Sequence, residues 1–152
     1  MSNVRVFVSF DTEHDGDLCA LLLAESRRDG SGFEIAGRTE TTADPGGDKV
    51  RRRIAAADEV IVVCGEHTDE SPRSQSELRI AQEEEKPYFL LWGRRESMCK
   101  RPESAKAGDA MYSWTREILL AQINETIRNA TPREIPESLK RAVPRRAEAT
   151  RE

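Results

Sequence analysis

Two spacings of apolar residues alternate along the chain, one typical of strands and one typical of helices. Continuous or alternating apolar runs predict strands at residues 4–10 (VRVFVSF), 33–36 (FEIA), 59–65 (EVIVVCG) and 87–93 (PYFLLWG), with a weak fifth at 110–114 (AMYSW). Between these runs, apolar residues recur every three or four positions, which predicts helices. The residues that mark these helix faces are Leu18, Leu21 and Leu22; Val50, Ile54 and Ala57; Leu78 and Ala81; and Leu119, Ile123 and Ile127 in a last helix over 114–130.

This alternation of strands and helices predicts an α/β fold. Right-handed crossovers favour a doubly wound, flavodoxin-like three-layer sandwich, with a parallel sheet of four to five strands in the order 2-1-3-4-5. Ligands of such sheets bind beyond the carboxyl ends of the strands, at the switch point between the first and third strands. The loops at that edge are expected to begin at Phe10-Asp11, Arg38, Glu66-His67 and Arg94.

Glu77 is an acid on the predicted buried face of the helix that follows the third strand. A helix turns about 100° per residue, so Ser74, Leu78, Ile80 and Ala81 fall on the same side as Glu77. A buried carboxylate usually pairs, titrates or binds a ligand, because burying an unpaired charge is costly. Glu77 is therefore either a functional group close to the expected crevice or an ordinary residue at the margin of the apolar stripe.

Composition and charge narrow the class of protein. The chain has 152 residues, which suits one domain, and it is 37% hydrophobic and 34% charged. We find no membrane-length apolar run and no signal peptide, and we expect a cytoplasmic protein without a membrane partner. The formal net charge of −4 argues against a dedicated nucleic-acid binder. The domain is expected to occupy residues 1–130, followed by a charged, proline-punctuated tail at 131–152 with at most a short helix near 137–142.

Several other chemistries find little support in the sequence. The chain lacks the dinucleotide fingerprint GxGxxG and the P-loop GxxxxGK[ST]. His14 and His67 lie in suitable loops but without a matching set of acids, so we expect no metal site. The cysteines form no CxxC pair; Cys19 and Cys64 are expected to be buried thiols and Cys99 a surface one. Trp92 and Phe33 are stacking candidates for which core packing is the simpler role.

The order of motifs resembles that of a TIR domain, and more narrowly the bacterial TIR-like proteins of the Thoeris anti-phage type. The motifs are VRVFVSFD, a loop containing DPGG, and VRRRIAAADEVIVVCGEHTDESPRSQSELRIAQEEEKPYFLLWG, spanning about residues 4–93. Two details depart from the family pattern. Ser74 and its neighbours replace the Trp-Cys that commonly precedes the family's glutamate, and the second loop is arranged as DPGGD.

This resemblance implies an activity. Many TIR domains cleave the bond between nicotinamide and ribose in NAD, and Thoeris-type members release a cyclised ADP-ribose signal that activates an effector. NAD would then be a substrate, with no further cofactor. The family's catalytic glutamate corresponds to Glu77, and Phe10 and Asp11 match the loop that lines the same pocket. Ser74 is expected either to bind substrate or to cap its helix, and His67 to reach substrate from its loop.

The resemblance also leaves two non-catalytic functions open. TIR domains serve as adaptors that associate through helix and loop surfaces, including with copies of themselves, and the basic VRRRI helix or the charged tail is a candidate surface. Alternatively, a flavodoxin-like module can bind a nucleotide without turning it over. Glu77 discriminates between the enzyme and a pure adaptor, which has no need of an acid at this position. Binding of NAD without release of nicotinamide would favour the nucleotide-binding module.

Overall fold

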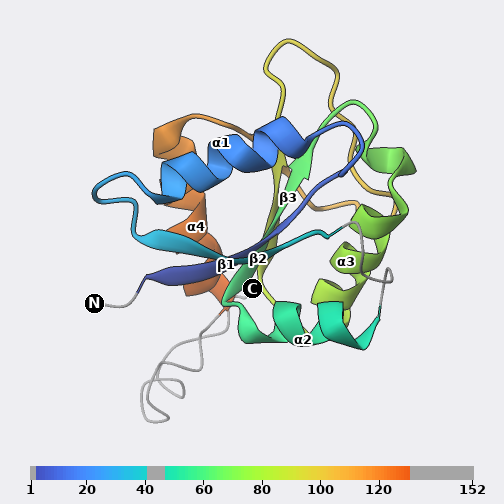
Figure 1. Cartoon of the computed structure of the whole chain (residues 1–152), viewed down its shortest axis with the longest axis horizontal. Coiled ribbons are helices and arrows are strands. Elements are labelled where there is room, and N and C mark those ends of the chain that lie inside the picture. Colours follow the sequence, from blue (N-terminus) through green and yellow to red (C-terminus); the bar gives the residue numbers. More distant parts are fainter. Residues whose placement is uncertain (1–2, 41–46, 131–152) are drawn as a thin grey trace.

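The computed structural model describes residues 3–40 and 47–130, which form a parallel sheet of five strands with helices on both faces (Figure 1). The strands lie in the order β2-β1-β3-β4-β5, as predicted, so the doubly wound, flavodoxin-like α/β class is confirmed. In chain order the elements are β1 (Val4–Ser9), α1 (Gly16–Ser26), β2 (Phe33–Arg38), α2 (Asp48–Ala56), β3 (Glu59–Cys64), the 3₁₀ turn η1 (Thr68–Glu70), α3 (Pro72–Glu83), β4 (Tyr88–Trp92), β5 (Met111–Ser113) and α4 (Arg116–Ala130).

Two separate hydrophobic clusters fill the space between the sheet and its helices. Helices α1 and α4 cover one face, where Leu22 and Leu119 pack on Ile61 and Val63 of β3. Helices α2 and α3 cover the other face, and the cluster there is built from Val50, Ile54, Leu78 and Ala81 against Val60, Val62 and Cys64. All six residues of β3 are buried, because the central strand is covered on both sides, as its uninterrupted apolar run indicates.

The limits predicted for the strands and for the last helix agree with the structure to within one residue, except that the end of β2 and the start of α4 each differ by two. Strand β2 continues to Arg38 instead of ending at Ala36, because a register shift between Val6 and Phe7 lets Gly37 and Arg38 pair with β1. Helix α4 begins at Arg116 instead of Trp114, because the Thr115 side chain accepts a hydrogen bond from the Ile118 amide (3.1 Å) at the start of the helix. The weak fifth strand is confirmed as β5.

The three cysteines are free thiols, and all three are buried. This confirms the expectation for Cys19 and Cys64, but the surface position expected for Cys99 is wrong. The Cys99 Sγ accepts a hydrogen bond from the Arg94 amide (3.4 Å) and lies 3.5 Å from the Arg94 carbonyl oxygen. These contacts fold the loop after β4 back on itself and place Cys99 in the core cluster beneath α2 and α3.

Some predicted features lie outside the described residues. These are most of the DPGG loop, the whole 131–152 tail and its expected short helix. Within residues 3–40 and 47–130, no helix combines the length and hydropathy needed to cross a membrane.

Candidate functional site

Glu77 lies in the first half of α3, which packs against the carboxyl end of β1. The helix begins with Ser71 as its N-cap, whose Oγ accepts a hydrogen bond from the Ser74 amide (3.2 Å), and Pro72 occupies the first turn, where its missing N–H costs nothing. From this start, helical periodicity turns Glu77 towards the sheet, and its side chain is 2% exposed. The carboxylate is therefore buried, and it is not an edge residue of the apolar stripe.

Two hydroxyl groups bind the Glu77 carboxylate from neighbouring strands. Ser9, the last residue of β1, donates to Glu77 Oε1 at 2.7 Å. Thr39, the residue after β2, donates to the same oxygen at 2.5 Å. Thr39 is itself held in place, because its amide donates to the Val8 carbonyl (3.0 Å) and its Oγ1 accepts from the Phe10 amide (3.1 Å). Glu77 thus joins α3 to the ends of both strands.

The surroundings of Glu77 bring its titration to neutral pH. Burial disfavours the ionised form and raises the pKa of Glu77 to about 7. The hydrogen bonds from Thr39 and Ser9 and the positive charge of Arg73 act in the opposite direction, because each favours the carboxylate. Near neutral pH the side chain therefore exists in both protonation states, a property suited to acid–base chemistry.

Ser74 lies one turn before Glu77 and is completely buried. Its Oγ has no hydrogen-bond partner among the described residues, and the helix cap is Ser71. The Ser74 side chain therefore does not cap the helix, which was one of the two roles expected for it. A buried hydroxyl without a partner is costly, so this group is available to a ligand or a water molecule.

Asp11 and His67 face a separate cavity of about 340 Å³ beside the start of α3. His67 stacks on His14 with ring centroids 4.0 Å apart. The His14 Nδ1 donates to Asp11 Oδ2 (2.7 Å), and this hydrogen bond raises the pKa of His14. Asp11 Oδ1 accepts from the Glu13 amide (3.0 Å), so both oxygens of Asp11 already hold its own loop together. Arg73 also lines this cavity, and its charge acts on Glu77.

Phe10 is 6% exposed and packs in the cluster beneath α1 and α4. Its amide, and not its ring, belongs to the Glu77 network through Thr39. Phe33 is also a core residue, as expected, while Trp92 is half-buried and donates Nε1–H to the Arg94 carbonyl (2.8 Å). The structure thus joins the Phe10 amide to Glu77 through Thr39, places Ser74 one turn before Glu77 on α3, and places Asp11 and His67 on the cavity beside the start of that helix.

The loops at this edge of the sheet are fastened together by Arg94. Its guanidinium contacts Asp15 Oδ1 (3.0 Å), Asp17 Oδ1 (2.8 Å) and the His14 carbonyl (2.9 Å), which joins the loop after β4 to the start of α1. Asp15 fills the space above Gly65, where an added Cβ would lie 2.3 Å from Asp15 Oδ2. Among the described residues, no group of three or more His, Cys, Asp and Glu side chains is arranged to hold a metal ion.

Comparison with known proteins adds a likeness of fold. The chain is similar to a prokaryotic SEFIR domain known from a crystal structure, with 20% sequence identity, a TM-score of 0.49, and coverage of 84% of this chain and 95% of that domain. No protein-family model matches the chain, and no curated protein matches it. The roles of individual residues must therefore be argued from the site itself.

Proposed function

We propose that this chain is a TIR-like enzyme that cleaves the bond between nicotinamide and ribose in NAD, with Glu77 as the catalytic residue. The observation that carries the proposal is the buried Glu77 carboxylate, which is held by Ser9 and Thr39 at the carboxyl edge of the sheet and has a pKa of about 7. The choice of NAD as the substrate rests on the order of motifs from the first strand to Glu77-Leu78, which resembles that of TIR domains.

The chemistry requires a carboxylate of this kind. As the bond between C1′ and the ring nitrogen breaks, both electrons go to the nicotinamide, which leaves as a neutral molecule, and positive charge develops on the ribose. An ionised Glu77 stabilises that charge. Water then bonds to C1′ and gives up a proton to the carboxylate, which yields ADP-ribose. If a group of the same nucleotide attacks instead, the product is a cyclised ADP-ribose, as in a Thoeris-type anti-phage signal read by a separate effector.

Access of substrate is the further requirement. Glu77 is 2% exposed, so NAD reaches the carboxylate only after neighbouring groups move aside. The adjoining 340 Å³ cavity lies at the lower end of the roughly 300–1,000 Å³ of small-molecule sites, which is small for a dinucleotide. We therefore expect low activity until a trigger opens the site.

The same burial favours a second candidate, a non-catalytic TIR adaptor or nucleotide-binding module. In that case the two hydroxyl groups and Glu77 serve to fix α3 against β1 and β2, and the protein acts through association with partners or with copies of itself. The two candidates differ in whether nicotinamide is released.

The deciding experiment is incubation of the purified protein with NAD, with nicotinamide and ADP-ribose products separated by chromatography. We expect Glu77→Gln to lower nicotinamide release by about 100-fold or more, because Gln keeps the shape but not the charge that stabilises the ribosyl cation. Glu59→Gln is the matched control, since Glu59 is also a fully buried glutamate but lies at the start of β3, at the opposite edge of the sheet.

Circular dichroism would establish that both variants are folded, and NAD levels in cells that produce each protein would test activity where a trigger is present. Equal turnover by wild type and Glu77→Gln would contradict the proposal. Binding of NAD without nicotinamide release in either setting would favour the non-catalytic candidate.

A further inference from the structure

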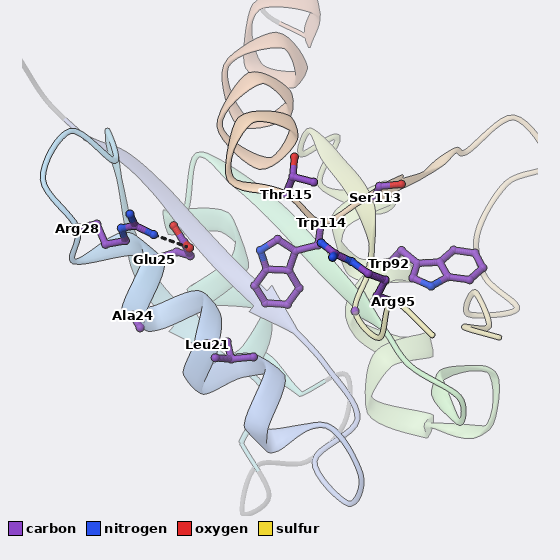
Figure 2. A pocket seen from close by; sticks show the side chains of 10 residues that line it. Leu21, Ala24, Glu25, Arg28, Trp92, Arg95, Ser113, Trp114 and Thr115 are labelled. Atoms are coloured by element: carbon purple, nitrogen blue, oxygen red, sulfur yellow. Dashed lines mark hydrogen bonds and ion pairs between the residues drawn. The ribbon is translucent and has the colours of Figure 1, made fainter. Parts of the chain in front are cut away.

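A groove of about 910 Å³ lies on the face of the sheet opposite to α3, between α1 and the segment that joins β5 to α4 (Figure 2). It shares no lining residue with the cavity beside Asp11 and His67. We call it the α1–α4 groove. Helix α1 forms one wall with Leu21, the Trp114 indole stands on the other, and Arg95 reaches in from the loop after β4.

The apolar part of the groove exposes side chains that a folded protein normally covers. Leu21 is 57% exposed, although its neighbours Leu18 and Leu22 on the same helix are buried. Trp114 is half-buried, with one side packed against the core cluster beneath α1 and α4. Trp92 points away from Trp114, so Trp114 is the aromatic ring offered to a ligand (Figure 2). A flat ring can enter between Leu21 and Trp114 and stack on the indole.

The charged part of the groove carries excess positive charge. Its one acid, Glu25, is already paired on both oxygens, by Arg28 (3.3 Å) and by Arg116 (3.0 Å). Arg95 is exposed and has no ion pair or hydrogen bond within the part of the chain that the structure describes. Two arginines, Arg28 and Arg95, thus line the groove beside one glutamate that is already paired, and the excess positive charge favours an anionic group near Arg95.

Two polar side chains, from the end of β5 and from the segment that joins it to α4, also line the groove, beside Trp114 and Arg95. Ser113 and Thr115 flank Trp114 in sequence and both line the groove (Figure 2). Thr115 Oγ1 accepts a hydrogen bond from the Ile118 amide, so its hydroxyl hydrogen can still donate to a ligand. A ligand with a flat ring, hydroxyl groups and a negative charge therefore finds a chemical partner for each of these groups in the groove.

We infer that the α1–α4 groove binds a nucleoside monophosphate, with the base stacked on Trp114, the ribose hydroxyls near Ser113 and Thr115, and the phosphate paired with Arg95. The groove is large enough for such a ligand, because small-molecule sites span roughly 300–1,000 Å³. This site is independent of Glu77, which lies beneath α3 on the other face of the sheet.

The chain offers a direct probe, because it has two tryptophans, Trp92 and Trp114. In a Trp92→Phe background, emission comes from Trp114 alone. We expect AMP to quench this emission and to bind at least about tenfold more tightly than adenosine, which lacks the phosphate, or ribose 5-phosphate, which lacks the ring. Isothermal titration of the wild-type protein should rank the three ligands in the same order.

Substitutions then assign the contacts. Arg95→Ala should weaken AMP binding about tenfold and leave adenosine unchanged, because one charge-assisted contact is lost. Arg52→Ala is the matched control, since Arg52 is an exposed arginine on α2. Leu21→Glu, at an exposed position that tolerates a polar side chain, should weaken AMP binding by adding a negative charge to the wall.

Three results would overturn the inference: no response of Trp114 to AMP at millimolar concentration, equal binding of AMP and adenosine, or nicotinate binding as tightly as AMP, which would make the groove a site for simple aromatic carboxylates. Glu77→Gln should bind AMP as the wild type does. Failure of the NAD cleavage proposal would therefore leave this result unchanged, and the reverse also holds.

Discussion

Two buried glutamates, at opposite edges of the same sheet, have different surroundings. Glu77 lies at the carboxyl edge and receives hydrogen bonds from Ser9 and Thr39, and its pKa is about 7. Glu59 begins β3 at the amino edge, is fully buried, and has no hydrogen-bond partner for either oxygen among the described residues; burial raises its pKa to about 9. Strand alternation places it on the side of Ile61 and Val63, beneath α1 and α4.

This difference shows what hydroxyl partners do for a buried acid. Burial raises the pKa of both groups, but only Glu77 has donors and a nearby cation that favour the ionised form. Glu59 therefore stays protonated across physiological pH and behaves as a neutral polar group. Of the two glutamates, Glu77 exchanges its proton near neutral pH, which is the property that the proposed cleavage of NAD uses.

The largest expected effect separates the two groups through the pH dependence of stability. Between pH 4.5 and about 9 the unfolded chain has ionised Glu59 while the folded chain keeps it protonated. The unfolded state then binds fewer protons, so the contribution of Glu59 to the free energy of unfolding falls as pH rises, by about 1.4 kcal/mol per pH unit. Glu59→Gln should remove this loss, and urea denaturation at pH 5, 7 and 9 would measure it. Parallel curves for wild type and variant would show that Glu59 is ionised in the folded protein.

A smaller effect over a narrower range is expected for Glu77. The contribution of Glu77 to the free energy of unfolding also falls as pH rises, but only from pH 4.5 to about 7. The free energy of unfolding of Glu77→Gln relative to wild type should therefore increase by about 3 kcal/mol in that range and then stay constant. The glutamine oxygen can still accept from Ser9 and Thr39, which keeps the pH-independent part of the change small. A difference that keeps growing between pH 7 and pH 9 would mean that Glu77 resembles Glu59.

The smallest expected effect is a rise in the pKa of Glu77 towards that of Glu59 when one hydrogen-bond donor is removed. Ser9→Ala removes one donor from Glu77 Oε1, and its hydroxyl has no other hydrogen bond among the described residues. We expect the pKa of Glu77 to rise to about 8, because a hydrogen bond to a charged group contributes about 1.5–3 kcal/mol, part of which water replaces. Carbon-detected NMR titration of the glutamate carboxyls would measure the change.

The control for this titration is Ser26→Ala, which removes a serine hydroxyl that bonds the Leu23 carbonyl at the end of α1. An unchanged pKa in Ser9→Ala would assign the control of Glu77 to Thr39 and Arg73.

Much of this arrangement follows from sequence spacing. The apolar runs predict the strands and their order, and helical periodicity places Glu77 on the buried side of α3. The partners of Glu77 are harder to predict, because the sequence around Thr39 is typical of a polar loop. Thr39 comes opposite Ser9 only through the register shift that lengthens β2. Glu59 is a polar residue at the margin of an apolar run. Its burial is not evident from the sequence, because it depends on packing between separate elements. Leu21 fits the apolar stripe of α1, and only the structure shows it on an open groove.

The two outer strands of the sheet also limit how the domain can associate with other chains. Strand β5 has three residues and therefore offers few unpaired backbone groups to another strand. The other outer strand, β2, has six residues but exposes the charged side chains of Glu34 and Arg38. Short and charged edge strands discourage the edge-to-edge strand pairing that leads to filaments and amyloid. An association of the described domain with another chain is therefore expected to use its helix surfaces, where contacts can form without extending the sheet.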